Sequence, residues 1–208
     1  MPMMSDPKRW TALETEFLQD CAVFTVSRTA SLSPRTGIQH TFYRIDSADW
    51  VNIVPVTDQG EVVMVRQYRH GLGEITLEIP GGMVDPGESP EGAAIRELLE
   101  ETGYRARELK SIGAVSPNPA LFGNRVHTYA ALGAEPVAEI RNEGAEETHV
   151  ELVPLDDLPE RVRSGDVDHA LVIAALHFFE LSRPGFAQSD LPQSESGRSK
   201  PGRGGVGE

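Results

Sequence analysis

Apolar and polar positions divide the middle of the chain into strand-like and helix-like segments. Short runs rich in β-branched and other apolar residues, bounded by turn-forming residues, predict strands. They cover residues 51–55, 61–67, 111–115, 126–132 and 149–153. A further apolar run (Ile75, Leu77, Ile79) ends at Pro80-Gly81-Gly82 and also predicts a strand.

Three segments have the periodicity or the end signals of helices. Residues 90–102 follow Ser89, which suits an N-cap, and precede Gly103, which suits the left-handed position after a last turn. A short helix is predicted within 155–165, and Asp168 is predicted to cap a last helix. The apolar residues of that helix recur at helical spacing: Leu171, Val172, Ala175, Leu176 and Phe179. Strands with helices to either side predict an α/β protein with a mixed sheet between helical layers.

The two ends of the chain differ from this core. Residues 22–27 and 39–45 have strand composition and flank the turn-prone segment 33–37, which predicts an N-terminal β extension. A hairpin alone is marginal in water and needs a surface to pack against. The last residues are rich in Gly, Ser and Pro and are predicted to be disordered. The expected organisation is therefore an extension at 1–47, a core at 48–182 and a tail at 183–208.

Composition limits the classes of function. The chain has 208 residues and a net charge of −13, so nucleic acid is not an expected partner. Cys21 is the only cysteine, which excludes an intrachain disulfide and favours a reducing compartment. No apolar run has the length of a membrane span, and the first residues lack the apolar stretch of a signal peptide. We therefore expect a cytoplasmic protein without a membrane partner.

The densest candidate chemistry lies between residues 82 and 104, GMVDPGESPEGAAIRELLEETGY. Glu97, Glu100 and Glu101 are spaced i, i+3, i+4, so a helix carries all three carboxylates on one face. Like charges at this spacing destabilise a helix by roughly 0.2–0.5 kcal/mol per pair unless a positive group lies among them. Mg²⁺ fits that place because it binds carboxylates together with substrate phosphates. The alternative, a solvated acidic face, leaves the offsets of Glu88 and Arg96 unexplained.

This segment resembles the Nudix hydrolase signature, G-x5-E-x7-R-E-U-x-E-E-x-G-U with U apolar. It matches at every defined position: Gly82, Glu88, Arg96, Glu97, Leu98, Glu100, Glu101, Gly103 and Tyr104. The resemblance implies an α/β/α sandwich with a mixed sheet, here with an added N-terminal β extension. It also implies metal-assisted attack of water on a diphosphate that is linked to a second moiety.

Roles within the signature follow from the same resemblance. Glu97 and Glu101 are expected to be the principal metal ligands, Glu100 a ligand or a water-orienting group, and the Gly81 carbonyl a further ligand. Mg²⁺ is the expected cofactor, with Mn²⁺ as the alternative. Glu88 and Arg96 are expected to hold the loop against the helix, since an Arg–carboxylate pair fixes geometry.

Substrate residues must lie outside the signature. Residues 65–69 and 77–82 resemble the branch that hydrolyses ADP-ribose and nucleotide sugars, which implies that Arg69 contacts a substrate phosphate or ribose. The Arg69 fork suits two phosphate oxygens, and Arg66 is a second candidate.

Two further groups of residues are candidates for substrate contacts. The loop 116–120 (SPNPA) resembles a loop of the same branch and makes Pro119 a candidate, although its two prolines are also compatible with a stiff turn. Trp50 and Phe42 are candidates for stacking on a base, with burial in the core as the favoured alternative for both.

The catalytic base and the oligomeric state are also suggested by the branch. It often uses a loop glutamate shortly before a strand, but Thr148 stands at the commonest position for that acid. Glu147 and Glu146 are therefore the candidate bases, with His149 and Glu100 as alternatives. In the same branch an N-terminal sheet exchanges across a homodimer, which we expect here; a hairpin folded onto its own core is the alternative.

The predicted function is metal-dependent hydrolysis of ADP-ribose or another nucleoside diphosphate sugar to a nucleoside monophosphate and a sugar phosphate. One alternative is Nudix hydrolysis of dinucleoside polyphosphates or oxidised nucleoside triphosphates. The other is a non-catalytic nucleotide-sugar sensor, which the retention of every signature glutamate argues against.

Overall fold

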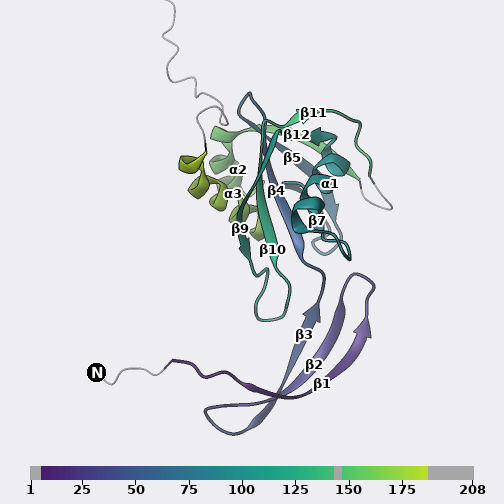
Figure 1. The fold of residues 1–208 in the computed structure, drawn as a ribbon, viewed down its shortest axis with the longest axis vertical. Coiled ribbons are helices and arrows are strands. Elements are labelled where there is room, and N and C mark those ends of the chain that lie inside the picture. Colours follow the sequence, from purple (N-terminus) through teal and green to yellow (C-terminus); the bar gives the residue numbers. More distant parts are fainter. Residues whose placement is uncertain (1–5, 143–146, 187–208) are drawn as a thin grey trace, which may run out of the picture.

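A mixed seven-stranded sheet forms the centre of the core and carries helices on both faces (Figure 1). The structure, a computed structural model, describes residues 6–142 and 147–186. The strand order is β12-β5-β4-β10-β9, with β6 paired to β5 and β7 paired to β4. Only the β10–β4 pairing is parallel among the pairs of this sheet. The strands are β4 (Trp50–Val56), β5 (Glu61–Arg69), β6 (Glu74–Glu78), β7 (Gly81–Met83), β9 (Glu108–Val115), β10 (Val126–Leu132) and β12 (Thr148–Pro154).

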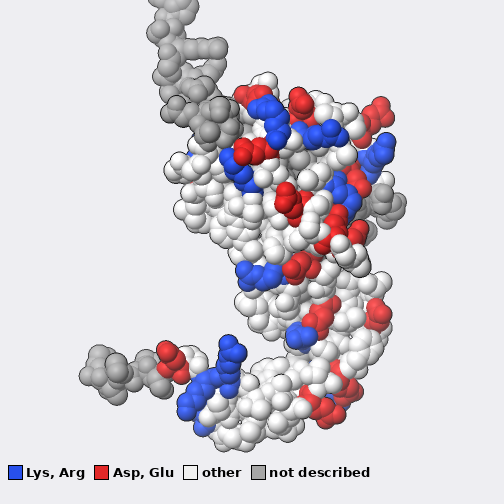
Figure 2. Space-filling model, in the orientation of Figure 1, with Lys and Arg blue, Asp and Glu red and all other residues white. Residues whose placement is uncertain are grey.

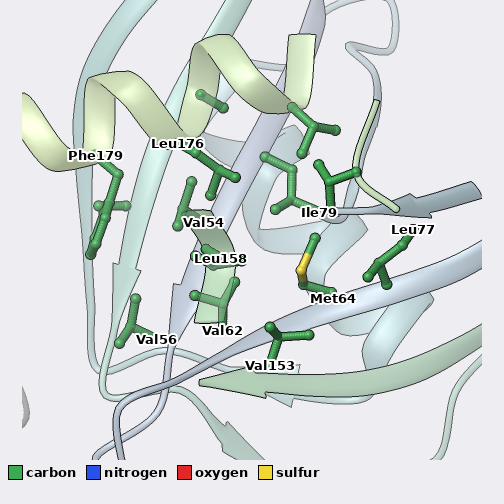
Figure 3. Close-up of a cluster of buried hydrophobic side chains, with 14 of the residues drawn as sticks. Val54, Val56, Val62, Met64, Leu77, Ile79, Val153, Leu158, Leu176 and Phe179 are labelled. Atoms are coloured by element: carbon green, nitrogen blue, oxygen red, sulfur yellow. The ribbon is translucent and has the colours of Figure 1, made fainter. Parts of the chain in front are cut away.

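Alternation along the strands sends apolar side chains to two separate core clusters. On one face α1 (Pro90–Thr102) packs Ala93, Ala94 and Leu98 against β4 and β10. On the other face α2 (Leu158–Ser164) and α3 (Ala170–Ser182) cover the larger cluster, which Figure 3 shows around Met64 and Phe179. Full burial of a side chain of this size stabilises a fold by about 1.5–3 kcal/mol. The predicted mixed sheet between helical layers is confirmed.

Sequence periodicity located most core elements within a few residues. The predicted helix at 90–102 has the bounds of α1, and each of the five strands predicted from short apolar runs is present. The short helix predicted within 155–165 is the 3-10 turn η1 (Leu155–Asp157) followed by α2. The prediction that Asp168 caps the last helix is wrong. Here α3 begins at Ala170, and His169 occupies the N-cap position without a side-chain capping bond.

The sheet splits between β4 and β5, and this split positions the start of the signature. The two strands share a single paired position, Val56 with Val62, after which they diverge. From there β6 pairs with β5, while β7 pairs with β4, placing Gly81 opposite Asn52. The signature loop therefore begins at a strand wedged into the sheet and leads directly into α1.

A separate three-stranded antiparallel sheet precedes the core and lies at the end of the molecule away from the helices (Figure 1). It consists of β1 (Thr11–Asp20), β2 (Thr25–Leu32) and β3 (Gln39–Asp46). Every residue of β1 is exposed, including Leu13 and Phe17 at 54% and 62%. Ile45 joins this sheet to the core, since its N–H donates to the Leu121 carbonyl at 2.8 Å.

The prediction for this region was partly wrong. The strand expected at 39–45 corresponds to β3, but the one expected at 22–27 begins only at Thr25, after a turn in which Ala22 has a φ of 66°. Strand β1 was not predicted, because a strand exposed along its whole length lacks the one-sided apolar alternation that identifies strands. The hairpin is not folded onto its own core but extends from it (Figure 1).

The remaining elements are short. A two-stranded ladder joins β8 (Tyr104–Arg105) to β11 (Glu135–Pro136). The described fold extends past the predicted core as the 3-10 turn η2 (Arg183–Gly185), after which Phe186 packs on Phe179 with ring centroids 5.7 Å apart. Residues 187–208 of the predicted tail lie outside the described residues.

Surface charge and helix length bear on the expected partners. On the face shown in Figure 2, Lys and Arg side chains lie interspersed with Asp and Glu side chains. Among the described residues, no helix combines the length and the apolar composition needed to cross a membrane.

Candidate active site

Helix α1 begins and ends where its local sequence dictates. The Ser89 hydroxyl accepts a hydrogen bond from the Gly92 N–H at 3.0 Å, which satisfies one of the free donors of the first turn. Gly103 has a φ of 72°, a left-handed conformation that glycine adopts without strain, and its N–H donates to the Leu99 carbonyl. These caps fix the face on which the signature glutamates lie.

Two of those glutamates converge on the glycines of β7. The buried carboxylate of Glu101 accepts a hydrogen bond from the Gly81 N–H at 2.9 Å. The Glu97 carboxylate lies against Gly82 so closely that a Cβ on Gly82 would overlap it. Gly81 in turn approaches the backbone of Val51 too closely for a side chain. Both glycines therefore permit the helix carboxylates and the sheet backbone to meet.

Arg96 fastens the signature loop to the helix. Its guanidinium donates to both oxygens of Glu88 at 3.2 and 3.0 Å and to the Met83 carbonyl at 3.0 Å. Its Nη1 also donates to Glu97 at 2.8 Å and to Glu100 at 3.1 Å. The bonds to Glu88, followed by those to the other glutamates, outweigh burial and raise the pKa of Arg96, and the same pair lowers the pKa of Glu88.

These contacts correct one step of the sequence argument. A positive group does lie among the glutamates, but in this structure it is Arg96, which joins Glu97 to Glu100. Crowding of carboxylates alone therefore does not require a metal ion. Among the described residues, no three Asp, Glu, His or Cys side chains already form a group that could hold a metal ion.

The donor set still fits a hard divalent cation. Glu97 and Glu101 present carboxylate oxygens at Gly82 and Gly81, two adjacent glycines of one strand. Oxygen ligands of this kind, completed by substrate phosphates, are what Mg²⁺ and Mn²⁺ prefer. Glu100 lies on the same helix face but is tied to Arg96.

The same two glycines form part of the wall of a cavity of about 380 Å³. One part of the lining is polar, with Arg69 and His169, and the rest is largely apolar: Trp50, Val51, Met83 and Leu171. Pockets for small molecules commonly combine an apolar lining with a few placed polar groups. This cavity is therefore the candidate substrate pocket.

Arg69 reaches the cavity while its fork is held by a buried carboxylate. Its Nε and Nη2 donate to the two oxygens of Glu78, each at 2.8 Å, and Thr76 donates to the same carboxylate at 2.6 Å. Burial raises the pKa of Glu78, but the contacts with Arg69, His169 and Thr76 outweigh burial and hold that pKa well below its usual range. The carboxylate therefore stays ionised and fixes the orientation of Arg69.

The other predicted substrate residues lie in different surroundings. Arg66 and Arg69 are an odd number of positions apart on β5, so their side chains leave opposite faces. Arg66 contacts Glu151 at 2.6 Å and Asp166 at 3.4 Å. The structure thus places Arg66 in an ion-pair network, away from the residues that line the candidate pocket.

Of the aromatic candidates and Pro119, only Trp50 lines the candidate pocket. Trp50 lines the candidate pocket, half-buried, with its ring edge against Phe122. Phe42 is 48% exposed on the N-terminal sheet, so its expected burial in the core is wrong; it is exposed because β3 leaves the core. Pro119 lines another cavity, of about 410 Å³, between that sheet and the loop before β10, together with Trp10, Phe42 and Phe122.

The loop that was expected to supply the base is only partly described. Glu146 lies outside the described residues. Glu147 is exposed, with one oxygen 3.4 Å from His149 Nε2. The next residue, Thr148, is buried and donates to the Glu101 carbonyl at 2.8 Å. The residue at the commonest position for the acid therefore ties the loop to the end of α1.

Sequence reasoning missed two polar residues of the pocket region, Glu78 and His169. Glu78 carried a usable signal, because it stands between the apolar residues Leu77 and Ile79, and an acid buried among apolar residues needs a cation nearby. His169 carried none, since it is 91 positions from Glu78 in the chain and only the fold brings them to 3.2 Å.

Comparison with known proteins agrees with this geometry. In fold, the chain is an α/β/α sandwich similar to a solved structure titled "Crystal structure of ADP compounds hydrolase". The TM-score is 0.77, the identity 24%, and the match covers 88% of this chain and 98% of the other. A family model described as NUDIX domain matches residues 47–176. The chain therefore belongs to the Nudix family and is a Nudix hydrolase, a class that uses a divalent metal ion.

Curated relatives share much of the chain. An ADP-ribose pyrophosphatase of Bacillus subtilis is 38% identical over 133 residues, which is 63% of this chain and 71% of the relative. An ADP-ribose pyrophosphatase of Mycobacterium tuberculosis is 31% identical over 179 residues, 85% of this chain and 86% of the relative. The second match is longer than the segment 47–176 that the family model covers.

Proposed function

We propose that the chain hydrolyses the diphosphate bond of ADP-ribose or another nucleoside diphosphate sugar, with Mg²⁺ as the metal ion. The products are a nucleoside monophosphate and a sugar phosphate. The names of the two bacterial relatives support this substrate class. The observation that carries the proposal is the junction at β7, where Gly81 and Gly82 meet both the signature carboxylates and the cavity that holds Arg69.

The residues of the chain divide the work by position. Glu97 and Glu101, with the Gly81 carbonyl, would hold the cation; when bound, it supplies charge neutralisation at the diphosphate and makes water a better nucleophile. Arg96, held by Glu88, positions the Glu97 carboxylate, and the Gly81 N–H positions that of Glu101. Arg69 lines the cavity and binds a phosphate or the ribose of the substrate. The aromatic face of Trp50 suits stacking on the base.

Glu147 is our first candidate for the group that accepts a proton from water. The hydrogen bond from Thr148 to the Glu101 carbonyl supports this choice, because it attaches the residue that follows Glu147 to the end of α1. Glu100 is the second candidate, although it must exchange its contact with Arg96 for one with water. Comparing Glu147→Gln with Glu100→Gln decides between them, because only loss of the base removes the acidic limb of the kcat profile against pH.

A substrate panel tests the proposed function. The protein is incubated with ADP-ribose, sugar nucleotides, dinucleoside polyphosphates and nucleoside triphosphates, with Mg²⁺, with Mn²⁺ and with neither, and the products are identified. Release of AMP and ribose 5-phosphate from ADP-ribose, dependent on a divalent ion, is expected. Turnover of triphosphates alone would replace this proposal with the alternative Nudix chemistry, and no turnover with any compound would favour a sensor.

We also propose that the N-terminal 47 residues form the contact of a homodimer. A sheet of three strands that exposes Leu13 and Phe17 along a fully exposed strand lacks a core of its own. Packing against a second copy would cover it and would bring two 48–182 units together. The exposed thiol of Cys21 on this extension suits a reducing cytoplasm.

Light scattering after gel filtration tests the dimer. Phe17→Ser should yield monomers, whereas Gln19→Ser, on the same exposed strand, should leave the dimer intact. A monomeric wild type, or a Phe17→Ser protein that remains dimeric, would contradict the proposal. Fractionation of cells with an antibody to the protein tests the compartment, and recovery with a secreted marker would rule out the cytoplasm.

A further inference from the structure

His169 occupies an unusual place at the polar end of the candidate substrate pocket. It stands at the N-cap position of α3, where its side chain makes no capping bond. Its imidazole lines the same cavity as Arg69 and Gly82, and 40% of the side chain is exposed. Because its side chain does not cap the helix, the ring is available to contact a molecule bound in the cavity.

One edge of the His169 ring faces a buried carboxylate. Nδ1 lies 3.2 Å from Oε2 of Glu78, which is itself only 2% exposed. Nδ1 is buried and is one of three such side-chain polar atoms, among the described residues, without a hydrogen bond of normal geometry. A buried nitrogen beside an ionised carboxylate favours a proton on that nitrogen. The exposed 40% of the side chain therefore belongs to atoms other than Nδ1, and Nε2 is the second nitrogen of the ring.

Contacts on both sides of His169 anchor the segment that carries it. Upstream, Asp166 is bound by Arg161 and Arg66 in the network that joins α2 to β5. Downstream, the Leu171 carbonyl accepts a hydrogen bond from Asn52 Nδ2 at 3.2 Å, which ties the first turn of α3 to β4. The backbone that carries His169 is thus anchored before and after the residue, which favours preorganisation of its side chain.

We propose that His169 is a substrate-binding residue whose Nε2 donates a hydrogen bond to a phosphate oxygen of the substrate, while Nδ1 is held towards Glu78. This inference rests on the proposed function and adds a residue to its substrate contacts. When the ring carries both protons, Nδ1 donates to Glu78 and Nε2 to the diphosphate.

The geometry of the cavity selects the phosphate as the partner. Gly81 and Gly82 are the wall that the cavity shares with the metal-binding carboxylates, so the part of the substrate nearest this wall is its diphosphate. Arg69 and His169 are the polar side chains of the same lining, and Glu78 contacts both. The apolar remainder of the lining suits a less polar moiety.

Two amide substitutions separate a role in binding from a role in supporting Glu78. In His169→Asn the amide nitrogen takes the place of Nδ1, so the contact with Glu78 is kept and reach into the cavity is lost. In His169→Gln the amide nitrogen takes the place of Nε2, so the reach is kept. His169→Ala removes both, and His177→Asn, two turns further along α3 and lining a different groove, is the matched control.

The assays are steady-state kinetics with ADP-ribose and Mg²⁺, calorimetric binding of ADP in the presence of Mg²⁺, and thermal unfolding of each variant. His169→Asn and His169→Ala should raise KM for ADP-ribose, and Kd for ADP, by similar factors of about 10 to 100, as for one hydrogen bond to a charged group. kcat should change less. His169→Gln and the control should stay close to the wild type.

Each other outcome overturns the inference. If His169→Asn keeps the wild-type KM while His169→Gln raises it, the ring only supports Glu78. A raised KM for ADP-ribose with an unchanged Kd for ADP would assign the contact to the sugar. If the wild type hydrolyses no nucleoside diphosphate sugar, the proposed function fails by itself; binding of ADP still tests His169, and unchanged affinity in His169→Asn overturns its role.

Discussion

Replacing Gly82 with alanine tests how the signature carboxylates are held. The new Cβ would overlap the Glu97 carboxylate, and the φ of Gly82 lies outside the left-handed region, so the clash is the only structural change. The displaced atoms end a flexible side chain, and moving Glu97 off its preferred rotamer costs about 0.5–1.5 kcal/mol. A shift of a ligand by about 1 Å can lower kcat about 100-fold. We therefore expect a large loss of kcat with a small loss of stability.

Two other glycines serve as controls for this prediction. In Gly81→Ala the Cβ meets the Val51 carbonyl, which belongs to the backbone and cannot rotate away, so the free energy of unfolding should fall by about 1–3 kcal/mol. In Gly71→Ala the Cβ meets no described atom within 4 Å, so kcat and the free energy of unfolding should both be unchanged.

The assay is kcat with saturating ADP-ribose and Mg²⁺, paired with urea unfolding of each variant. Gly82→Ala should lower kcat strongly and the free energy of unfolding only slightly, whereas Gly81→Ala should lower the free energy of unfolding. If Gly82→Ala keeps kcat within twofold of the wild type, the contact between Gly82 and Glu97 does not position a ligand.

The remaining predictions concern single charged residues. Glu101→Gln keeps an acceptor for the Gly81 N–H, so the fold should survive while the Kd for Mg²⁺ rises at least about tenfold and kcat falls about 100-fold, measured by calorimetry and kinetics; unchanged turnover would refute the ligand assignment. Glu147→Gln should have a smaller effect on kcat than Glu101→Gln, and the reverse order would contradict the assigned roles. Arg96→Lys keeps the charge but loses the fork, and should lower the free energy of unfolding by about 1–3 kcal/mol in urea; an unchanged midpoint would show that these bonds add nothing. Because the pKa of Glu78 is held below its usual value, its stabilisation is complete above about pH 4.3 and is lost as the pH falls below that value. Glu78→Gln should therefore flatten the loss of stability in acid, and an equally steep loss would be inconsistent with that pKa.

Local sequence signals located the elements that carry the signature. The bounds of α1 followed from Ser89 and Gly103, because capping residues act within one turn of the helix they end. The pairing of Arg96 with Glu88 was predictable for the same reason, since their positions are set by one loop and one helix. What the pattern could not give is that Arg96 also bridges Glu97 and Glu100, because the fork has several carboxylates within reach.

Contacts between distant parts of the chain were the ones that sequence reasoning missed. Arg66 and Arg69 looked alike in sequence, yet they leave opposite faces of β5, and Glu78 is drawn to only one of them. The contact of His169 with Glu78 depends on how α3 packs over β4, and no local pattern encodes that arrangement. Strand β1 escaped prediction because its environment is exposed on every side.

Anomalous diffraction from Mn²⁺ tests the central claim most directly, in crystals of the wild-type protein with an ADP-ribose analogue that has a methylene group in place of the bridging oxygen. The predicted result is a peak within bonding distance of the Glu97 and Glu101 carboxylates and of a diphosphate oxygen, with Glu97 turned from Arg96 towards the ion. A peak elsewhere, with Glu97 still bound to Arg96 and Glu101 still bound only to the Gly81 N–H, would contradict the account.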